Sequence, residues 1–355
     1  MRKTLLLLGF SISIFGILAF SKSYFTPIYF EVPKGFPKPI YNFKDNPLTE
    51  EGFQLGRKLF YDPILSKDST ISCASCHLQQ TGFTHVDHDL SHGIDGKIGT
   101  RNSLTLQNLA WSKTFMWDGG VNYLDVQAIA PITSEVEMNE TLENVVNKLN
   151  NSKEYQELFH KAFGTKKISG QLTLKAISQF VVSLTTSNSK YDKVIRKEDK
   201  FTEMEQKGYV LFKQNCASCH TEPLFTNHNF KNNGLPIDTT LNDFGRMKVT
   251  QNSKDSLLFK VPTLRNIEFT FPYMHDGRFK TLSEVVKHYN FGIQKSKTLS
   301  KELETPLNLS DNQRVELVSF LKTLTDKEFL FNPRYNFQKI INKNARIKKN
   351  YRLIK

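Results

Sequence analysis

The sequence predicts a mostly α-helical fold made of two related domains, with long loops and little strand. The chain has 355 residues, which is enough for two domains of ordinary size. A short unit is repeated, because apolar residues at helical spacing precede Cys73 and again precede Cys216. Helix starts are well marked, whereas the alternating pattern of strands is weak throughout.

Residues 1–23 have the features of a secretory signal peptide. Two basic residues precede an apolar run of 16 residues from Leu5 to Phe20, and small residues close the segment. A helix that spans a bilayer needs about 20 residues. This favours cleavage near Ser21 or Ser23 over a permanent N-terminal membrane anchor, which remains the alternative. We therefore expect a periplasmic location.

The chain is basic, with a formal net charge of +13, and segment 341–355 is expected to be a basic tail. Nucleic acid is not an expected partner of an exported protein. Solvated surface lysines are the ordinary reason for such a charge. A basic surface can also steer an acidic electron donor toward the protein. A homodimer is one further assembly that we consider.

The first half is expected to begin with an extended segment and to continue as helices. Residues 24–46 are rich in proline and aromatic residues, which favours an extended path across a domain surface. From Thr49 onward, apolar residues recur at helical spacing. A further helix with one apolar face is expected over Gln171–Leu184.

Three capping boxes mark the second half, each a Ser or Thr followed three residues later by Glu or Gln. They predict helices that start at Thr202, Thr281 and Ser310. We place the domain boundary in the polar stretch before the first of these helices. The chain is thereby divided into an N-terminal domain over 24–190 and a C-terminal domain over 191–340.

Each half contains one Cys-Ala-Ser-Cys-His motif. The motifs consist of Cys73, Cys76 and His77 in the first half and Cys216, Cys219 and His220 in the second. Two thiols at this spacing can bond both vinyl groups of one porphyrin, and the adjacent His becomes the proximal iron ligand. Disulfides or a zinc site are the alternatives, but zinc does not require a His after each second Cys, and 143 residues separate the pairs. The sequence therefore predicts two covalently bound haem c groups in two cytochrome c-like domains.

Further motifs occur in a fixed order along the chain. They are LGRKLFYDP at Leu55–Pro63, RNS at Arg101–Ser103, FMWDG at Phe115–Gly119 and PYMHDG at Pro272–Gly277. Together with the haem motifs, they make residues 47–335 similar to the bacterial di-haem cytochrome c peroxidases, including their MauG-type relatives. The resemblance implies a peroxidatic first haem and an electron-transferring second haem.

The resemblance also implies a set of catalytic residues, which match Gln127, Pro131 and Glu137 by their spacing from Trp117. Glu137 would move a proton between the two peroxide oxygens, a role that suits a carboxylate in an apolar pocket. Gln127 would orient peroxide by hydrogen bonding, and Pro131 would shape the distal face. Without the resemblance, Glu137 would be read as an ordinary surface carboxylate.

The first haem is expected to be five-coordinate at rest, with His77 as its only protein ligand. Family members that need reductive activation have a distal His at a position that is Ile94 here. His85, His88 and His92 lie in the same loop, and each is expected to be a solvated loop histidine. A shifted loop could still bring one of them to the iron.

The sixth ligand of the second haem has four candidates, which are Met274, His275, His288 and Tyr289. The helix predicted from Thr281 has an apolar stripe that includes Tyr289, whereas His288 lies about 100° away on the polar side. The resemblance agrees, because MauG-type members have a ligand Tyr at the position of Tyr289. A phenolate stabilises ferric iron and would lower the potential of this haem relative to a Met ligand. Tyr289 is therefore preferred, with His288 as the alternative.

Two further roles follow from the resemblance alone. Trp117 would lie between the haems and help to carry electrons, although a buried core aromatic is the ordinary role of such a residue. A calcium ion would lie between the domains, held by the Asn102 side chain and by the backbone carbonyls of Thr270 and Pro272. Oxygen ligands of this kind suit a hard cation.

These features predict an enzyme that reduces hydrogen peroxide to water with electrons from a small cytochrome c or cupredoxin. One alternative is a MauG-like oxidase that removes electrons from a side chain of a partner protein. Tyr289 and the missing distal His favour that alternative. The second alternative is a non-catalytic dihaem electron-transfer protein, which would need neither Gln127 nor Glu137.

Overall fold

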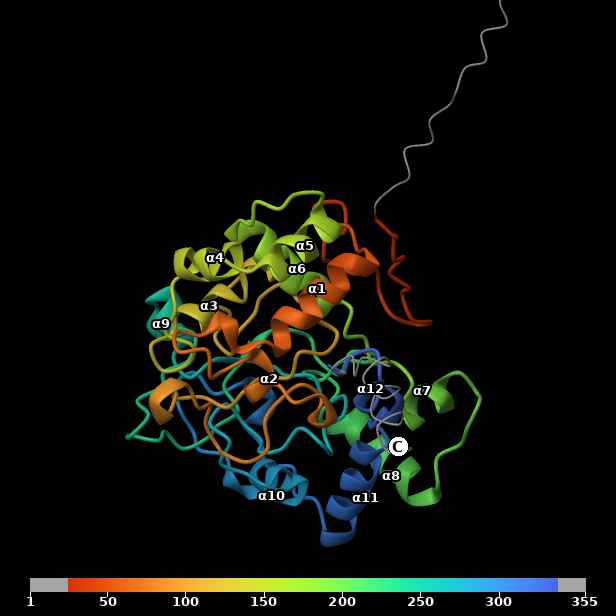
Figure 1. Ribbon diagram of the computed structural model, residues 1–355. Coiled ribbons are helices and arrows are strands. Elements are labelled where there is room, and N and C mark those ends of the chain that lie inside the picture. The colour runs from red at the N-terminus through yellow and green to blue at the C-terminus, as the bar shows by residue number, and fades with distance from the viewer. Residues whose placement is uncertain (1–24, 338–355) are drawn as a thin grey trace, which may run out of the picture.

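The computed structural model describes residues 25–337, which form two groups of helices joined by long loops (Figure 1). The α-helices are α1 (Glu50–Tyr61), α2 (Cys73–Cys76), α3 (Ile129–Thr133), α4 (Leu142–Asn150), α5 (Lys153–Phe163), α6 (Gly170–Val182), α7 (Lys190–Ile195), α8 (Glu203–Asn215), α9 (Met247–Thr250), α10 (Leu282–Lys287), α11 (Asp311–Lys322) and α12 (Lys327–Leu330). The strands are β1 (Phe230–Lys231) and β2 (Phe259–Lys260), which pair antiparallel. Short 3₁₀ turns occur at Pro63–Leu65, Gln79–Thr81, Ile94–Gly96, Leu109–Trp111, Leu124–Val126, Ser253–Asp255 and Lys301–Leu303. The predicted class, mostly α with little strand, is confirmed.

The helix starts follow the local capping signals. The side chains of Thr202, Thr281 and Ser310 accept hydrogen bonds from the backbone three residues later, and each predicted capping box is complete. The helix predicted over 171–184 is α6, and residues 25–46 contain no helix. These predictions are confirmed.

A close helix crossing forms the centre of each half. Helix α1 packs on α6 in the first half, and α8 packs on α11 in the second. A Cβ at Gly56 would overlap the Ala176 carbonyl oxygen and lie 3.0 Å from Phe180 Cβ. A Cβ at Gly208 would meet Glu316 and Phe320 in the same way. Glycine therefore allows the two helices of each pair to approach to backbone contact.

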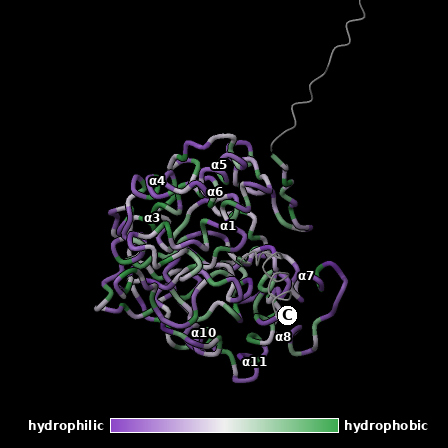
Figure 2. The backbone as a smooth tube through the Cα atoms, viewed as in Figure 1, coloured by the Kyte–Doolittle hydropathy of each residue, from purple (hydrophilic) through white to green (hydrophobic). Residues whose placement is uncertain are grey.

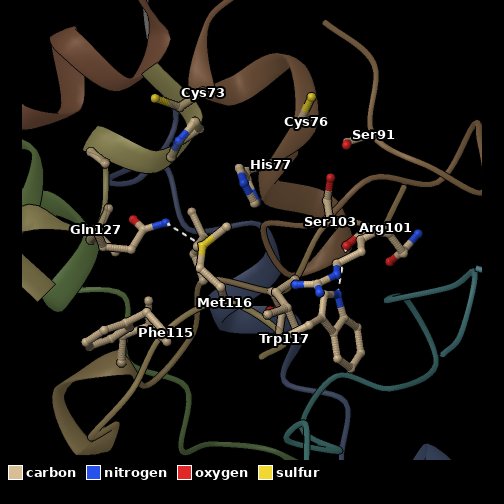
Figure 3. A pocket seen from close by; sticks show the side chains of 18 of the residues that line it. Cys73, Cys76, His77, Ser91, Arg101, Ser103, Phe115, Met116, Trp117 and Gln127 are labelled. Atoms are coloured by element: carbon tan, nitrogen blue, oxygen red, sulfur yellow. Dashed lines mark hydrogen bonds between the residues drawn. The ribbon is translucent and has the colours of Figure 1, made fainter. Parts of the chain in front are cut away.

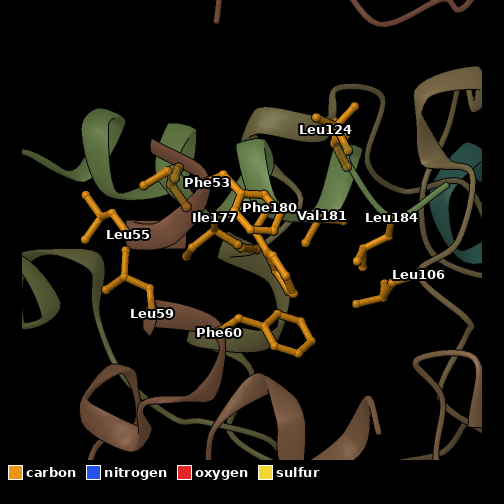
Figure 4. Close-up of a cluster of buried hydrophobic side chains, with 14 of the residues drawn as sticks. Phe53, Leu55, Leu59, Phe60, Leu106, Leu124, Ile177, Phe180, Val181 and Leu184 are labelled. Carbon is orange, nitrogen blue, oxygen red and sulfur yellow. The ribbon is translucent and has the colours of Figure 1, made fainter. Parts of the chain in front are cut away.

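Buried side chains from these helices form two hydrophobic cores. In the first core, Phe53 and Phe60 of α1 face Phe180 of α6 (Figure 4). The second core is built mainly from α8, α10 and α11. Phe329 and Leu330 of α12 return to the first core, so the end of the described chain packs across both halves. The domain boundaries expected from the sequence remain a prediction.

Hydrophobic and hydrophilic residues are intermingled along the described chain (Figure 2). Within residues 25–337, no helix has the length and apolar character that a membrane span requires. The predicted signal peptide at 1–23 and the basic tail at 341–355 lie outside the described residues.

Candidate active site

A large cavity of about 330 Å³ opens beside the first cysteine pair (Figure 3). Its wall includes the complete first haem motif, namely Cys73, Cys76 and His77. The same wall contains the three predicted distal residues, Gln127, Pro131 and Glu137. Segments separated by some 50 residues in the sequence are thus brought to one site.

The first haem motif is arranged to hold a porphyrin. His77 Nδ1 lies 2.8 Å from the Phe83 carbonyl oxygen, and such a contact of one ring nitrogen orients the other toward a metal. Burial lowers the pKa of His77 to about 4, so the imidazole is neutral at pH 7. The thiols of Cys73 and Cys76 are not joined in a disulfide bond. The residues present therefore fit a covalently attached haem.

Glu137 and Gln127 provide the polar groups of the distal side. Burial raises the pKa of Glu137 above its usual value, and a hydrogen bond with the Ser134 side chain opposes the shift. The Gln127 amide donates to the sulfur of Met116 at 3.8 Å, and Figure 3 shows this contact inside the cavity. The Ile94 backbone N–H donates to the Glu137 carbonyl oxygen at 2.9 Å. The position without an imidazole is thus joined to the backbone of Glu137.

The three histidines of the neighbouring loop lie close together. The ring centres of His88 and His92 are 3.9 Å apart, and those of His85 and His88 are 4.6 Å apart. His85 is 4% exposed, so the expectation that it is a solvated loop histidine is wrong. It is buried because the loop folds back over the first haem motif, where Cys76 contacts the His92 carbonyl oxygen. Among the described residues, no group of three or more His, Cys, Asp or Glu side chains has an arrangement that could hold a metal ion.

The second haem motif repeats the proximal arrangement. His220 Nδ1 lies 3.2 Å from the carbonyl oxygens of Phe225 and Pro262, and burial lowers its pKa to about 4. The thiols of Cys216 and Cys219 are free. This motif therefore also presents two thiols and a neutral imidazole to a porphyrin.

Tyr289 is influenced electrostatically by the second pair of thiols. Burial raises the pKa of Tyr289 to about 12, and the nearby Cys216 and Cys219 add to this shift, whereas a hydrogen bond with Asn233 opposes it. A phenol in this environment stays protonated at pH 7 unless a cation lies beside it. The position of Tyr289 is compatible with its predicted role as an iron ligand.

His288 does not point to solvent, and the expectation that it lies on the polar side of the helix is wrong. It is 5% exposed, and its Nε2 lies 2.9 Å from the Asn233 carbonyl oxygen. The cause is a π-helical turn over His288–Gly292, which directly follows α10. Such a turn contains more than 3.6 residues, so the 100° spacing used for the prediction no longer holds.

The other two candidates for the sixth ligand are Met274, which shares Asn233 with Tyr289 and His288, and His275. Met274 sulfur accepts a hydrogen bond from the Asn233 amide at 3.3 Å. The His275 ring stacks on Phe259 with ring centres 3.8 Å apart. It also meets the Trp117 ring edge-on at 6.5 Å. His275 therefore belongs to an aromatic contact between the two halves.

Trp117 and Arg101 lie where the halves meet. Trp117 is 9% exposed, and its Nε1 donates to the Asn102 carbonyl oxygen at 2.9 Å. Arg101 binds Asp118 from its own half and Asp243 from the other, each at 2.6 Å. Both residues line the first cavity. The aromatic predicted to lie between the haems is thus held beside an ion pair that links the halves.

The predicted calcium ligands are Asn102, Thr270 and Pro272. Asn102 is 6% exposed, and its side-chain N–H donates to the Asp89 carbonyl oxygen at 2.9 Å. Its backbone N–H donates to the His275 carbonyl oxygen at 2.7 Å. Asn102 therefore lies at the contact between the two halves, and the ion itself remains a prediction.

Sequence reasoning missed a second repeat and two residues of the cavity wall. Phe115 to Val121 and Tyr273 to Phe279 each close an antiparallel bridge around a Met-x-Asp-Gly sequence, with the Met at positive φ. The similarity of FMWDG to YMHDG was visible in the sequence. Lys260 and His228 also line the first cavity, and no local pattern marks them.

Comparison with known proteins connects both halves to haem proteins. Residues 50–200 match the family model of di-haem cytochrome c peroxidase, and residues 205–325 match that of cytochrome c. The chain is 35% identical over 307 residues to methylamine utilization protein MauG of Methylorubrum extorquens, covering 83% of each chain. It is 36% identical over 277 residues to cytochrome c551 peroxidase of Nitrosomonas europaea, covering 77% of this chain and 79% of the relative.

Solved structures give the same result for the fold. A MauG-like protein associated with microbial copper homeostasis has 31% sequence identity and a TM-score of 0.76, covering 87% of this chain and 99% of that one. The diheme peroxidase BthA from Burkholderia thailandensis is 21% identical, with a TM-score of 0.71 and coverage of 80% of this chain and 88% of that one. The second similarity supports the fold alone.

Proposed function

Because the chain belongs to the di-haem cytochrome c peroxidase family, we propose that it reduces hydrogen peroxide to water with electrons from a small redox protein. The balanced reaction consumes one peroxide, two electrons and two protons and yields two water molecules. A small cytochrome c or a cupredoxin would supply the electrons one at a time.

The observation that carries this proposal is the position of Glu137 in the wall of the first cavity, together with His77. Bound haem supplies the redox chemistry and the open coordination position. Glu137 takes a proton from one peroxide oxygen and returns it to the leaving oxygen, because burial brings its pKa closer to neutrality. The Gln127 amide donates a hydrogen bond to peroxide in place of its contact with Met116. Pro131 occupies the distal wall without adding a competing polar side chain.

In this proposal, the second haem receives the electrons and has Tyr289 as its sixth ligand. The electrostatic influence of Cys216 and Cys219 on Tyr289 supports this ligand over His288, whose Nε2 lies 2.9 Å from the Asn233 carbonyl oxygen. Trp117 would assist electron transfer toward the first haem. Its contact with His275 of the other half supports that role.

The proposal includes calcium at Asn102, with the carbonyl oxygens of Thr270 and Pro272. The Asn102 amide N–H binds Asp89, which leaves the amide oxygen available as a ligand. The proposal also includes export to the periplasm, with either a cleaved signal or an N-terminal anchor at 1–23. A homodimer is the assembly to be tested.

A MauG-like oxidation of a partner protein is the second candidate function. The electrostatic influence of the second pair of thiols on Tyr289 and the absence of a His at position 94 favour it. The similarity to MauG of Methylorubrum extorquens is compatible with it. A non-catalytic electron carrier is disfavoured, because a carrier has no use for a half-buried carboxylate in the wall of its haem cavity.

One experiment separates these functions. The purified dihaem protein is mixed with peroxide in a stopped-flow spectrometer, first alone and then with a reduced small cytochrome. Fast, catalytic oxidation of the donor supports the peroxidase. A long-lived oxidised protein with slow donor oxidation supports the MauG-like reaction, and absence of any reaction supports the carrier.

A further inference from the structure

We propose that Lys260 and His228 form the binding site for the propionate groups of the first haem. The proposal deepens the proposed function, since it rests on attachment of that haem at Cys73 and Cys76. It concerns the wall of the cavity that the second half of the chain provides. Both residues line this cavity together with His77.

The two side chains are brought to the cavity by the short antiparallel pair of strands. Lys260 ends β2 opposite Phe230 of β1, and His228 lies two residues before Phe230. The Lys260 backbone N–H donates to the Trp117 carbonyl oxygen at 2.7 Å, and its ammonium group donates to the Thr114 carbonyl oxygen at 2.9 Å. Lys260 is thus fixed against the segment that contains Trp117.

Lys260 carries a buried positive charge that lacks an acidic partner. It is 7% exposed, and no ion pair of Lys260 occurs within residues 25–337. Asp118 is close enough to act electrostatically, but its carboxylate is bound by Arg101 at 2.6 Å. An ammonium group has three N–H donors, and the Thr114 contact uses one. Buried charges are normally paired, so an anionic ligand is the expected occupant.

His228 presents a second unused polar atom. Its Nε2 is buried and has no hydrogen-bond partner among the described residues. Buried polar groups without partners are rare in folded proteins and call for a missing ligand. A neutral imidazole with its proton on Nε2 donates one hydrogen bond to a carboxylate.

The orientation of the porphyrin in the cavity identifies the propionates as the anionic ligand of Lys260 and His228. The vinyl groups and the propionates project from opposite edges of the haem, and the thioether bonds fix the vinyl edge at Cys73 and Cys76. Figure 3 shows these cysteines at one end of the cavity and Phe115 and Trp117 at the other. Lys260 is bound to the backbone at this far end. The propionate edge therefore faces Lys260.

The electrostatics of the cavity agree with this placement. Burial lowers the pKa of Lys260 to about 8. Burial and the charges of Lys260 and Lys113 lower the pKa of His228 to about 4. A carboxylate in contact with either group raises its pKa again, because it stabilises the charged or donating form. A propionate would thus relieve the unfavourable burial of both residues.

The test uses the full-length protein with both haems bound and does not depend on peroxide turnover. Lys260→Met keeps the volume and the packing on Phe115 but removes the charge. Resonance Raman spectroscopy reports the propionate bending band of the ferrous first haem, and a redox titration reports the potential of each haem. Lys254→Met is the matched control, because Lys254 is an exposed lysine in the turn Ser253–Asp255 before β2 and is not part of the cavity wall.

Lys260→Met is expected to shift the propionate band to lower frequency and to lower the potential of the first haem, since loss of a nearby positive charge favours ferric iron. Lys260→Arg is expected to keep both values near those of the wild type. Lys254→Met is expected to change neither, because solvent screens its charge. If Lys260→Met does not fold, His228→Phe provides the measurement, with a smaller shift in the same direction. The proposal is overturned if the propionate band and the potential of the first haem keep their wild-type values in Lys260→Met, or in His228→Phe where that variant is used. A shift confined to the second haem would also overturn it.

Discussion

Replacing Glu137 with Gln isolates the proton transfer on which the proposed function depends. Gln has nearly the same shape as Glu, so the cavity of about 330 Å³ and the contact with Ser134 are kept. The amide cannot take up and return a proton. A general acid–base group contributes about 10²–10⁴-fold to rate. We therefore expect kcat/KM for peroxide to fall by that factor, which corresponds to a loss of about 3–5.5 kcal/mol of transition-state stabilisation.

The assay is stopped-flow reduction of peroxide, followed at the Soret band and by oxidation of a reduced cytochrome. Glu135→Gln is the matched control, because Glu135 lies two residues away but is exposed and is not part of the cavity wall. It is expected to react like the wild type. A Glu137→Gln rate within about threefold of the wild type would refute the reasoning, because so small a loss leaves no transition-state role for the carboxylate.

The pH dependence gives an independent measurement of the same group. Glu137 accepts a proton only when it is ionised, so kcat/KM should fall as the pH drops through its pKa. Burial raises this pKa, which moves the acid limb of the profile above the usual range of a glutamate. The Ser134 hydrogen bond lowers it, so Ser134→Ala should move the limb to higher pH. Glu137→Gln should abolish the limb, and a limb that persists would belong to another group.

Three further predictions concern the second haem and the fold. Tyr289→Phe should change the visible spectrum of the second haem and raise its potential in a redox titration. His288→Gln should leave this spectrum unchanged. The opposite pattern would assign His288 as the ligand. Asp192→Asn should lower the free energy of unfolding by about 3–5 kcal/mol in a urea titration, because Arg265 is 0% exposed and binds both Asp192 oxygens. Burial raises the pKa of Asp192, but the ion pair with Arg265 outweighs burial and holds this pKa below its usual value. The stability that the pair contributes is therefore present above the unfolded pKa and is lost as the pH falls through the lower folded pKa. A urea titration curve of Asp192→Asn that matches the wild type would contradict both statements. Gly56→Ala should lower the free energy of unfolding by about 1–3 kcal/mol, because the new Cβ meets backbone rather than a movable side chain. Thermal unfolding measures this loss, and an unchanged melting temperature would show that the helices can separate freely.

Features that depend on near neighbours could be predicted from the sequence. A capping box needs only four consecutive residues, and the boxes at Thr202, Thr281 and Ser310 are all formed. A haem motif needs only five, so the thiols and imidazoles were identified without knowledge of the fold. Helix α6 was predicted to within two residues at each end, because its apolar face is continuous.

Features that depend on distant segments could not be predicted in this way. The burial of His85 follows from the path of its loop over the first haem motif, and turn residues do not encode that path. The direction of His288 depends on a π-helical turn, which has no strong sequence signal. Lys260 and His228 reach the first cavity from the other half of the chain. A reading of each domain by itself misses residues that one domain provides to the other.

The two halves share a scaffold but differ in the walls that surround it. Both haem motifs read Cys-Ala-Ser-Cys-His, and in both the proximal imidazole is held by backbone carbonyl oxygens. The glycine contacts at Gly56 and Gly208 are also equivalent. The difference arises beyond these repeated parts, where segment 127–137 provides a half-buried carboxylate and segment 288–292 provides Tyr289. The proposed division of labour between the haems therefore originates in the segments that close each pocket, since the attachment motifs alone cannot distinguish them.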